Sequence, residues 1–333
     1  MSASKNIACF VVLMLCLSTN SQGTDVLVIH PASLPNAHVY VAFSPDAKKV
    51  VTTGSTDGIR GGNIAVVWDA ETGDKILQLQ GHTDRIWSAV FSPCGEKILT
   101  GCDDHTARIW DSKTGKELAV LKAVSNAGGV YVGVFYASFF PDGNKIATAH
   151  NSIVHIWDSK SGEVLDRVEI HTGAIYPLHV SPNGETIVSA SFMRDTTIPQ
   201  IWDIKGKYRM SLQGHESVVH WVSFSPDGTM VVSASSDGTA RIWNSNTGKE
   251  MQRLTSQQGP IRCALFSPSG ERVITVGEGV QIWKLSEGKI IQELAEKGEF
   301  FKVAALSVDG RKLAVSSRDD GYVRIWTLEP PLL

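Results

Sequence analysis

The chain has little of several features that mark common functional classes. Only 20% of its 333 residues are charged, and 31 Lys and Arg nearly balance 34 Asp and Glu, for a net charge of −3. A nucleic-acid-binding surface needs a clustered excess of positive charge, so this balance argues against one. No apolar run reaches the roughly 18 residues that a membrane-spanning helix requires. The composition is that of a soluble globular protein that does not bind nucleic acid.

Cysteine and histidine are too scattered for a disulfide framework or a metal site. Outside the N-terminal stretch only Cys94, Cys102 and Cys263 remain. Cys94 falls in a turn and Cys102 at the far end of the following strand. At about 3.3 Å per residue they lie beyond the ~7 Å Cα limit of a disulfide. None of the 10 histidines has the spacing of a zinc site, so we expect no metal and no cofactor.

Glycine, tryptophan and short β-branched runs are what the chain has instead. Its 30 Gly and 9 Trp, with frequent Val, Ile and Thr, are typical of turns and strands. Runs such as Val231–Ala234 and Thr239–Trp243 alternate between apolar and polar residues in the manner of half-buried strands. The sequence therefore predicts an all-β fold.

Residues 1–23 have the pattern of a secretory signal peptide. Lys5 precedes an apolar run from Ile7 to Leu17, and Ser21 and Gly23 place small side chains at the −3 and −1 positions of a cleavage site. We therefore predict a protein exported to the periplasm or secreted, with no stable membrane span after cleavage. The alternatives are a membrane anchor and a cytoplasmic protein with a misassigned start.

Two sequence elements recur in phase after residue 24. Tryptophans that end strands follow one another at intervals of 40 to 47 residues. Upstream of each lies a turn such as Ser225–Gly228, in which Pro presets φ, Asp caps the turn and Gly takes the left-handed position. A unit of four short antiparallel strands cannot bury its faces alone, so the copies must stack. The tryptophans are Trp68, Trp110, Trp157, Trp202, Trp243, Trp283 and Trp326.

These repeats resemble the WD-repeat (WD40) family of β-propellers. The resemblance rests on the Gly-His dipeptides that begin at Gly81 and Gly214 and on Trp-Asp endings such as Trp110-Asp111. Seven copies over residues 25–327 imply a seven-bladed propeller of four-stranded antiparallel blades that spans residues 24–333. No fourth strand follows the last tryptophan. We therefore expect the segment Asp25–His30 to supply that strand and close the ring, which buries two sheet edges.

A hydroxyl, an imidazole and a carboxylate recur in the regular repeats. Without context, a Ser-His-Asp set suggests nucleophilic catalysis. The resemblance implies instead a buried network with the strand tryptophan, and we favour it because a nucleophile must be exposed to substrate. The network residues are His82, Thr100, Asp104 and Trp110 in one repeat, His171, Ser189, Asp195 and Trp202 in a second, and His215, Ser233, Asp237 and Trp243 in a third.

The resemblance also implies a partner-binding surface on the top face of the propeller. Its positions are the start of each first strand and the residue before the network aspartate. Three aromatic residues on successive blades would form an arc there, and aromatic and Arg anchors are favoured in interfaces. The alternative is that each aromatic only packs beneath a neighbouring loop. The implied contact residues are Arg85, Trp87, Asp103, Phe135, Tyr176, Arg194, His220, Arg262 and Lys302.

From these observations we predict a non-enzymatic, exported scaffold that binds a protein or peptide through its top face. A preformed rigid surface lowers the ordering cost of such binding. Two alternatives stay open. A hydrolase-type propeller enzyme would use the central channel and would need convergent carboxylates, histidines or a metal. A cytosolic subunit of a larger complex would retain the same surface without export.

Overall fold

All regular structure in the described part of the chain is β-strand. The computed structural model describes residues 18–19, 25–30, 39–54, 63–122, 133–170, 175–191 and 198–333. These residues contain no helix, and hence none with the length and hydropathy of a membrane span. The predicted all-β class is confirmed.

Five antiparallel sheets contain four strands each, in the order of the sequence. The first sheet contains β3 (Val41–Phe43), β4 (Lys49–Gly54), β5 (Ile64–Asp69) and β6 (Lys75–Leu79). The second contains β7 (Ile86–Phe91), β8 (Lys97–Cys102), β9 (Thr106–Asp111) and β10 (Glu117–Lys122). The third contains β11 (Tyr136–Phe139), β12 (Lys145–His150), β13 (Ile153–Asp158) and β14 (Val164–Glu169). The fourth contains β15 (Ile175–Val180), β16 (Thr186–Ser191), β17 (Gln200–Asp203) and β18 (Tyr208–Ser211). The fifth contains β19 (Val219–Phe224), β20 (Met230–Ser235), β21 (Thr239–Asn244) and β22 (Glu250–Thr255).

The Ser-Pro turns join the first and second strands, and their side chains fix the turn geometry. In the fifth sheet the Ser225 hydroxyl donates to Asp227 at 2.6 Å, and the amide of Met230 donates to Ser225 Oγ at 2.9 Å. Gly228 has a φ of 74°, a left-handed conformation in which an L side chain would be strained. The recurring sequence therefore sets the same hairpin in each copy.

A sixth sheet of seven strands joins the two ends of the chain. Its order is β1-β2-β27-β26-β25-β24-β23. Its pairing register divides it, because β24 pairs with β23 through its first half and with β25 through its second half. Likewise β25 pairs with β26 only from Phe301 onward. The strands are β1 (Ser18–Thr19), β2 (Asp25–Ile29), β23 (Ile261–Phe266), β24 (Arg272–Lys284), β25 (Lys289–Leu306), β26 (Lys312–Ser317) and β27 (Val323–Thr327).

The hydrophobic core lies between neighbouring sheets. Val67 and Leu79 of the first sheet pack in one cluster with Ile98 and Trp110 of the second, and all four side chains are buried. Full burial of such a side chain contributes about 1.5–3 kcal/mol. The outermost strands are mostly exposed, and β22 buries only Leu254. Each sheet thus depends on its neighbours for stability.

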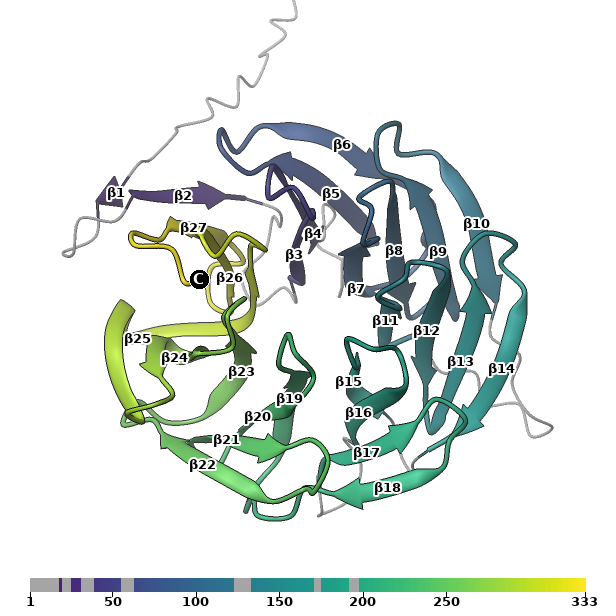
Figure 1. Cartoon of the computed structure of the whole chain (residues 1–333). Coiled ribbons are helices and arrows are strands. Elements are labelled where there is room, and N and C mark those ends of the chain that lie inside the picture. The colour runs from purple at the N-terminus through teal and green to yellow at the C-terminus, as the bar shows by residue number, and fades with distance from the viewer. Residues whose placement is uncertain are drawn as a thin grey trace, which may run out of the picture.

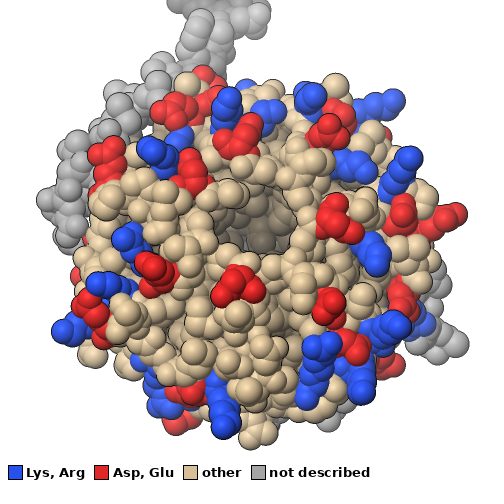
Figure 2. All heavy atoms as spheres, in the orientation of Figure 1, with Lys and Arg blue, Asp and Glu red and all other residues tan. Residues whose placement is uncertain are grey.

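The sheets are arranged around a common axis (Figure 1). First strands contact one another in turn, from β3 through β7, β11, β15, β19 and β23 to β25, which contacts β3 again. Figure 2 shows a central hollow on one face, with charged side chains of both signs spread over the surrounding surface. This mixture agrees with the nearly balanced charge of the chain.

The N-terminal segment pairs as the sequence analysis expects. Residues Val26–Ile29 of β2 lie antiparallel to β27, with Val26 opposite Trp326 and Ile29 opposite Val323. Two residues of the predicted leader, Ser18 and Thr19, form β1 and pair with β2. The rest of that segment, residues 1–17 and 20–23, lies outside the described residues. The count of seven blades and the closure of the ring stay predictions.

Candidate functional site

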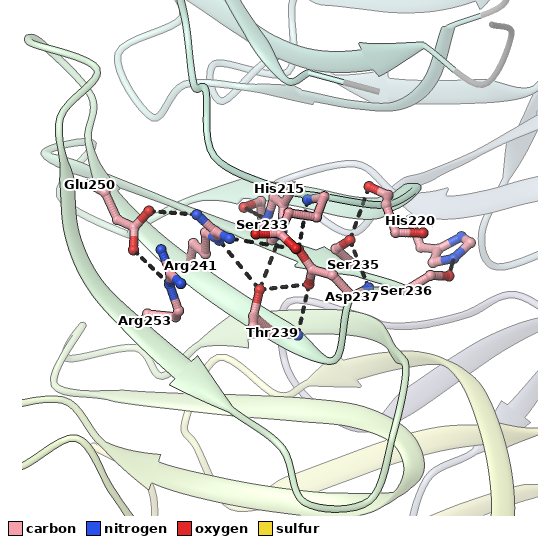
Figure 3. Close-up of polar contacts among 12 residues, drawn as sticks. His215, His220, Ser233, Ser235, Ser236, Asp237, Thr239, Arg241, Glu250 and Arg253 are labelled. Carbon is pink, nitrogen blue, oxygen red and sulfur yellow. Dashed lines mark hydrogen bonds and ion pairs between the residues drawn. The ribbon is translucent and has the colours of Figure 1, made fainter. Parts of the chain in front are cut away.

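The predicted hydroxyl–imidazole–carboxylate groups lie together in the fifth sheet (Figure 3). The Trp243 indole donates to Ser233 Oγ at 2.8 Å, and Ser233 Oγ lies 2.7 Å from His215 Nε2. His215 Nδ1 lies 2.8 Å from Asp237 Oδ2. One consistent set of donors satisfies every atom: indole to hydroxyl, hydroxyl to Nε2, and Nδ1–H to carboxylate. The network ties the segment before β19 to the turn between β20 and β21.

The second sheet repeats this arrangement. Trp110 donates to Thr100 Oγ1 at 2.9 Å, and His82 lies 2.7 Å from both Thr100 Oγ1 and Asp104 Oδ2. The exposed fraction of Thr100 is 0%, as is that of Ser233. A substrate therefore cannot reach either hydroxyl, which argues against a nucleophilic role.

The charges within the network follow from its hydrogen bonds. Burial by itself raises the pKa of Asp237, but hydrogen bonds from Thr239 and His215 outweigh it and lower the pKa to about 2. Burial lowers the pKa of His215, and Asp237 offsets this only in part. The carboxylate is therefore ionised and the imidazole neutral at pH 7.

Less regular repeats keep a shorter version of the network. Indole N–H groups donate to a threonine hydroxyl at 2.8 Å in Trp68, Trp157 and Trp283. In the third sheet His150 Nε2 lies 3.0 Å from the same hydroxyl, that of Thr148. His150 thus supplies the imidazole from the end of β12, a position that sequence spacing did not assign.

Half of the predicted fourth-repeat network is outside the described residues. His171 and Asp195 are among the residues that are not described. Ser189 is buried, and Trp202 packs edge-on against Tyr208 with ring centroids 5.4 Å apart. The sets with Trp110 and Trp243 are therefore those whose full geometry is seen.

An arginine, buried in the fifth sheet and half-buried in the second, extends each complete network and was not predicted from the sequence. Arg241 Nη1 lies 2.8 Å from Glu250 and its Nη2 lies 3.8 Å from Asp237, while Arg253 holds the other oxygen of Glu250 (Figure 3). Arg108 makes the same contacts with Glu117 and Asp104, at 2.6 and 3.6 Å. The sequence contains a signal for this arginine and its glutamate, because both repeats read Thr-Ala-Arg-Ile-Trp with Gly-Lys-Glu downstream.

This arginine explains the glycine of the Gly-His dipeptide. A Cβ on Gly214 would lie 2.3 Å from Arg241 Nη1, and one on Gly81 would lie 2.6 Å from Arg108 Nη1. The Arg241 side chain is only 3% exposed, so it has little room to move away. Glycine is needed there for close approach.

A cavity of about 590 Å³ brings most of the predicted partner-binding residues together. It is lined by aromatic and cationic side chains near the starts of the first strands. The Trp87 and Phe135 rings are in edge contact, with centroids 5.5 Å apart. Of the nine residues implied by the resemblance, the cavity wall includes Trp87, Phe135, Tyr176, His220, Arg262 and Lys302.

The remaining predicted residues lie elsewhere. Arg85 stacks over the ring of Trp87, with its guanidinium carbon 3.7 Å from the centroid, and does not line the cavity. Asp103 does not line it either, and burial raises the pKa of this carboxyl. Arg194 lies outside the described residues. Arg85 thus packs on a cavity residue without lining the cavity itself.

Sequence reasoning missed several lining residues, including Glu278, Phe300 and Arg318. Phe300 directly precedes the part of β25 that pairs with β26, and its exposed fraction is 38%. Arg318 follows β26, and its amide donates to the carbonyl of Phe300 at 2.7 Å. Phe300 lies two residues before Lys302, so a wider window around that implied position would have found it.

One group of metal-ligand atoms occurs among the described residues. His82, Cys102 and Asp104 each offer an atom within 4.8 Å of the others. These atoms are already engaged: His82 Nδ1 bonds Asp104, and the Cys102 thiol donates to the carbonyl of Asp84 at 3.1 Å. Burial raises the pKa of Cys102, which keeps the thiol protonated. A metal would have to break these bonds, and the residues do not fit one.

Comparison with known proteins gives relatives over most of the chain. Eukaryotic translation initiation factor 3 subunit I of Bos taurus is 27% identical over 288 residues, which cover 80% of this chain and 87% of that protein. Apoptotic protease-activating factor 1 of Rattus norvegicus is 27% identical, over 95% of this chain and 27% of its own. Autophagy-related protein 16 of Arabidopsis thaliana is 25% identical, over 69% and 44%.

These relatives contradict the predicted export. A translation initiation factor, by its name, acts where translation begins, which is the cytoplasm. The periplasmic or secreted location inferred from residues 1–23 is therefore wrong. A short apolar run after one lysine is a compositional signal, and its periodicity does not separate a leader from a buried segment.

The repeats themselves match a family model. The model described as WD domain, G-beta repeat matches residues 73–111, 206–244 and 289–327. The first two matches contain the complete networks of Trp110 and Trp243, and the third ends at Thr327, one residue after Trp326 in β27. The matches thus fall on the phase that the tryptophans define. The chain therefore contains WD repeats at these three positions.

Proposed function

We propose that the protein is a non-enzymatic subunit of a larger protein assembly. It binds a partner through the face on which the first strands begin. The observation that carries this proposal is the cavity of about 590 Å³ with aromatic and cationic walls, because such side chains are the usual anchors of protein interfaces. The names of the relatives support it, since one is a subunit of a multi-subunit factor.

The proposed scaffold is a ring of seven blades closed by β2. It is supported by the unbroken circle of contacts among first strands. The register of the seven-stranded sheet also supports it. The pairing divides the strands into two sets of four segments, one from β23 to the first part of β25 and the other from the second part of β25 to β2. A closed ring leaves only the short outer edge of each blade and presents the cavity on a rigid frame.

The cavity wall does not favour catalysis. Among its lining residues are one carboxylate, Glu278, and one imidazole, His220. His220 is already held by Arg262 and Ser236, at 2.6 Å each. General acid–base catalysis needs titrating groups that are free to reach the substrate. Glu278 and His220 do not supply such an acid–base pair.

Site-specific photo-crosslinking in living cells tests the binding face. A photoreactive phenylalanine at Phe300 lies at the cavity, and one at Val308 lies in the turn at the opposite end of the same strand. Both positions are exposed, at 38% and 67%. We expect a defined protein adduct from position 300 and none from position 308. Equal labelling at both positions, or none at 300, would contradict the proposal.

A further inference from the structure

The cavity has an excess of positive charge that the protein does not neutralise. Its lining residues include three cations, Arg262, Lys302 and Arg318, and one carboxylate, Glu278. Within the described part of the chain, none of these cations is joined to a carboxylate by an ion pair. This contrasts with Arg108 and Arg241 of the two networks, each of which has two carboxylates. The cavity therefore favours an anionic ligand.

The cations also repel one another. Burial lowers the pKa of Lys302 most, Arg318, Arg85 and Arg262 add to this effect, and Asp319 opposes it, so that the pKa is about 8. Burial and Arg318 likewise lower the pKa of Arg262. An anion between these groups would stabilise their charged forms.

Arg262 is held in place before any partner arrives. Its Nη1 lies 2.6 Å from His220 Nε2, and an arginine can only donate, so His220 accepts there and is neutral. Burial, with the nearby Arg262, lowers the pKa of His220 to about 4, which agrees with this state. Ser236 contacts the same ring at 2.6 Å and directly precedes Asp237 of the network (Figure 3). The network thus positions the cation indirectly.

Another part of the wall is apolar. Trp87 and Phe135 are in edge contact, and Tyr176 lines the same cavity. The partly exposed Phe300 adds an aromatic ring two residues before Lys302. The volume of about 590 Å³ falls in the range of sites that hold a drug-sized ligand, which also admits two or three side chains. One ligand can therefore contact both parts of the wall.

We propose that the cavity binds a segment of a partner protein in which Asp or Glu lies next to a large apolar side chain. The carboxylate is bound by Arg262, Lys302 and Arg318, and the apolar side chain packs against Trp87 and Phe135. Charge complementarity selects the acidic residue, and the aromatic wall excludes water around it. This proposal rests on the proposed function, because it names the occupant of that binding face.

Fluorescence anisotropy with labelled peptides tests the occupant. The probe is the capped peptide Gly-Ser-Phe-Glu-Glu-Ser-Gly, and the controls replace both Glu by Gln or the Phe by Ala. We expect each control to bind at least about 10-fold more weakly, because each loses one half of the recognition. We also expect added salt to weaken only the Glu peptides.

Matched protein variants assign the binding to the cavity. Lys302→Met and Arg318→Gln should each weaken binding of the Phe-Glu-Glu probe at least about 10-fold. Lys249→Gln removes one charge from an exposed hairpin and should leave binding unchanged. Near-ultraviolet circular dichroism checks that each variant is folded.

Equal binding of the Glu and Gln peptides would overturn the proposal. So would tighter binding of a single-stranded oligonucleotide or displacement of the probe by millimolar inorganic phosphate, since either would assign the cations to phosphate. If cross-linking at position 300 succeeds while the peptides fail, the face binds a protein but the occupant is not acidic. That result overturns this inference and leaves the proposed function standing.

Discussion

Replacing Ile29 with alanine tests whether β2 is an integral outer strand of the ring. Ile29 is 1% exposed, lies opposite Val323 of β27 and belongs to the largest core cluster. Truncating a fully buried isoleucine to alanine removes its transfer free energy and leaves a cavity, a loss of about 2–5 kcal/mol. We expect the free energy of unfolding to fall by this amount.

The first sheet offers matched controls. Leu79 ends β6 as Ile29 ends β2, and it is 0% exposed. Leu79→Ala should therefore cost about the same 2–5 kcal/mol. Ile76 lies in the same strand but is 42% exposed, so Ile76→Ala should change stability by roughly 0.5 kcal/mol or less. Urea unfolding followed by tryptophan fluorescence measures all three, with the slope m unchanged.

The test depends on comparing the loss of stability in Ile29→Ala with that in Leu79→Ala. If Ile29→Ala unfolds like the unmodified protein while Leu79→Ala is destabilised, β2 does not stabilise the ring and the closure scheme is wrong. A deletion of residues 24–31 would then leave the melting temperature unchanged as well. Parallel losses for Ile29 and Leu79 would instead mean that the N-terminal strand and a regular fourth strand do the same structural work.

Three further predictions concern the network and the cavity. Gly214→Ala should cost about 1–3 kcal/mol in urea unfolding, because the new Cβ meets Arg241; in an Arg241→Ala background the same change should cost less, with a remainder from Trp243 at 3.2 Å. The pKa of Asp237, at about 2, lies below its unfolded value of about 3.9. Its contribution is therefore present above pH 4 and lost as the pH falls towards 2, and Asp237→Asn should be less stable at pH 7 and lose less over that interval. Lys302, with a pKa of about 8, should make binding of the acidic probe weaken as the pH rises from 7 to 9. Anisotropy of the Lys302→Met variant should show no such change.

Most of the fold could be predicted from the sequence because its signals are local and repeated. Each Ser-Pro turn fixes a hairpin through contacts within five residues, as Ser225 does with Met230. The tryptophan spacing then sets the length of one sheet. Two residues of each complete network, such as His215 and Asp237, are 22 positions apart, and the repeat phase alone aligned them.

The parts that the sequence did not predict depend on contacts between repeats or on departures from them. Arg262 of β23 reaches His220 of β19, 42 residues earlier, and no spacing within one repeat relates the two. Strands β24 and β25 each join two strand segments of the repeat, and only the pairing register shows where one segment ends and the next begins. Export was predicted wrongly because an apolar segment carries no repeat to check it against.

The irregular repeats supply the cations of the cavity. Arg262, Lys302 and Arg318 come from the part of the chain with β23 to β26, where the tryptophan of β24 keeps its threonine bond but no His-Asp pair was found in the sequence. In the regular repeats the third-strand arginines Arg108 and Arg241 are paired with Glu117 and Glu250. The cavity cations occupy other positions, because Arg262 and Lys302 lie in β23 and β25 and Arg318 follows β26. The proposed binding surface therefore combines cations of the irregular repeats with aromatic residues of the earlier ones, Trp87 and Phe135.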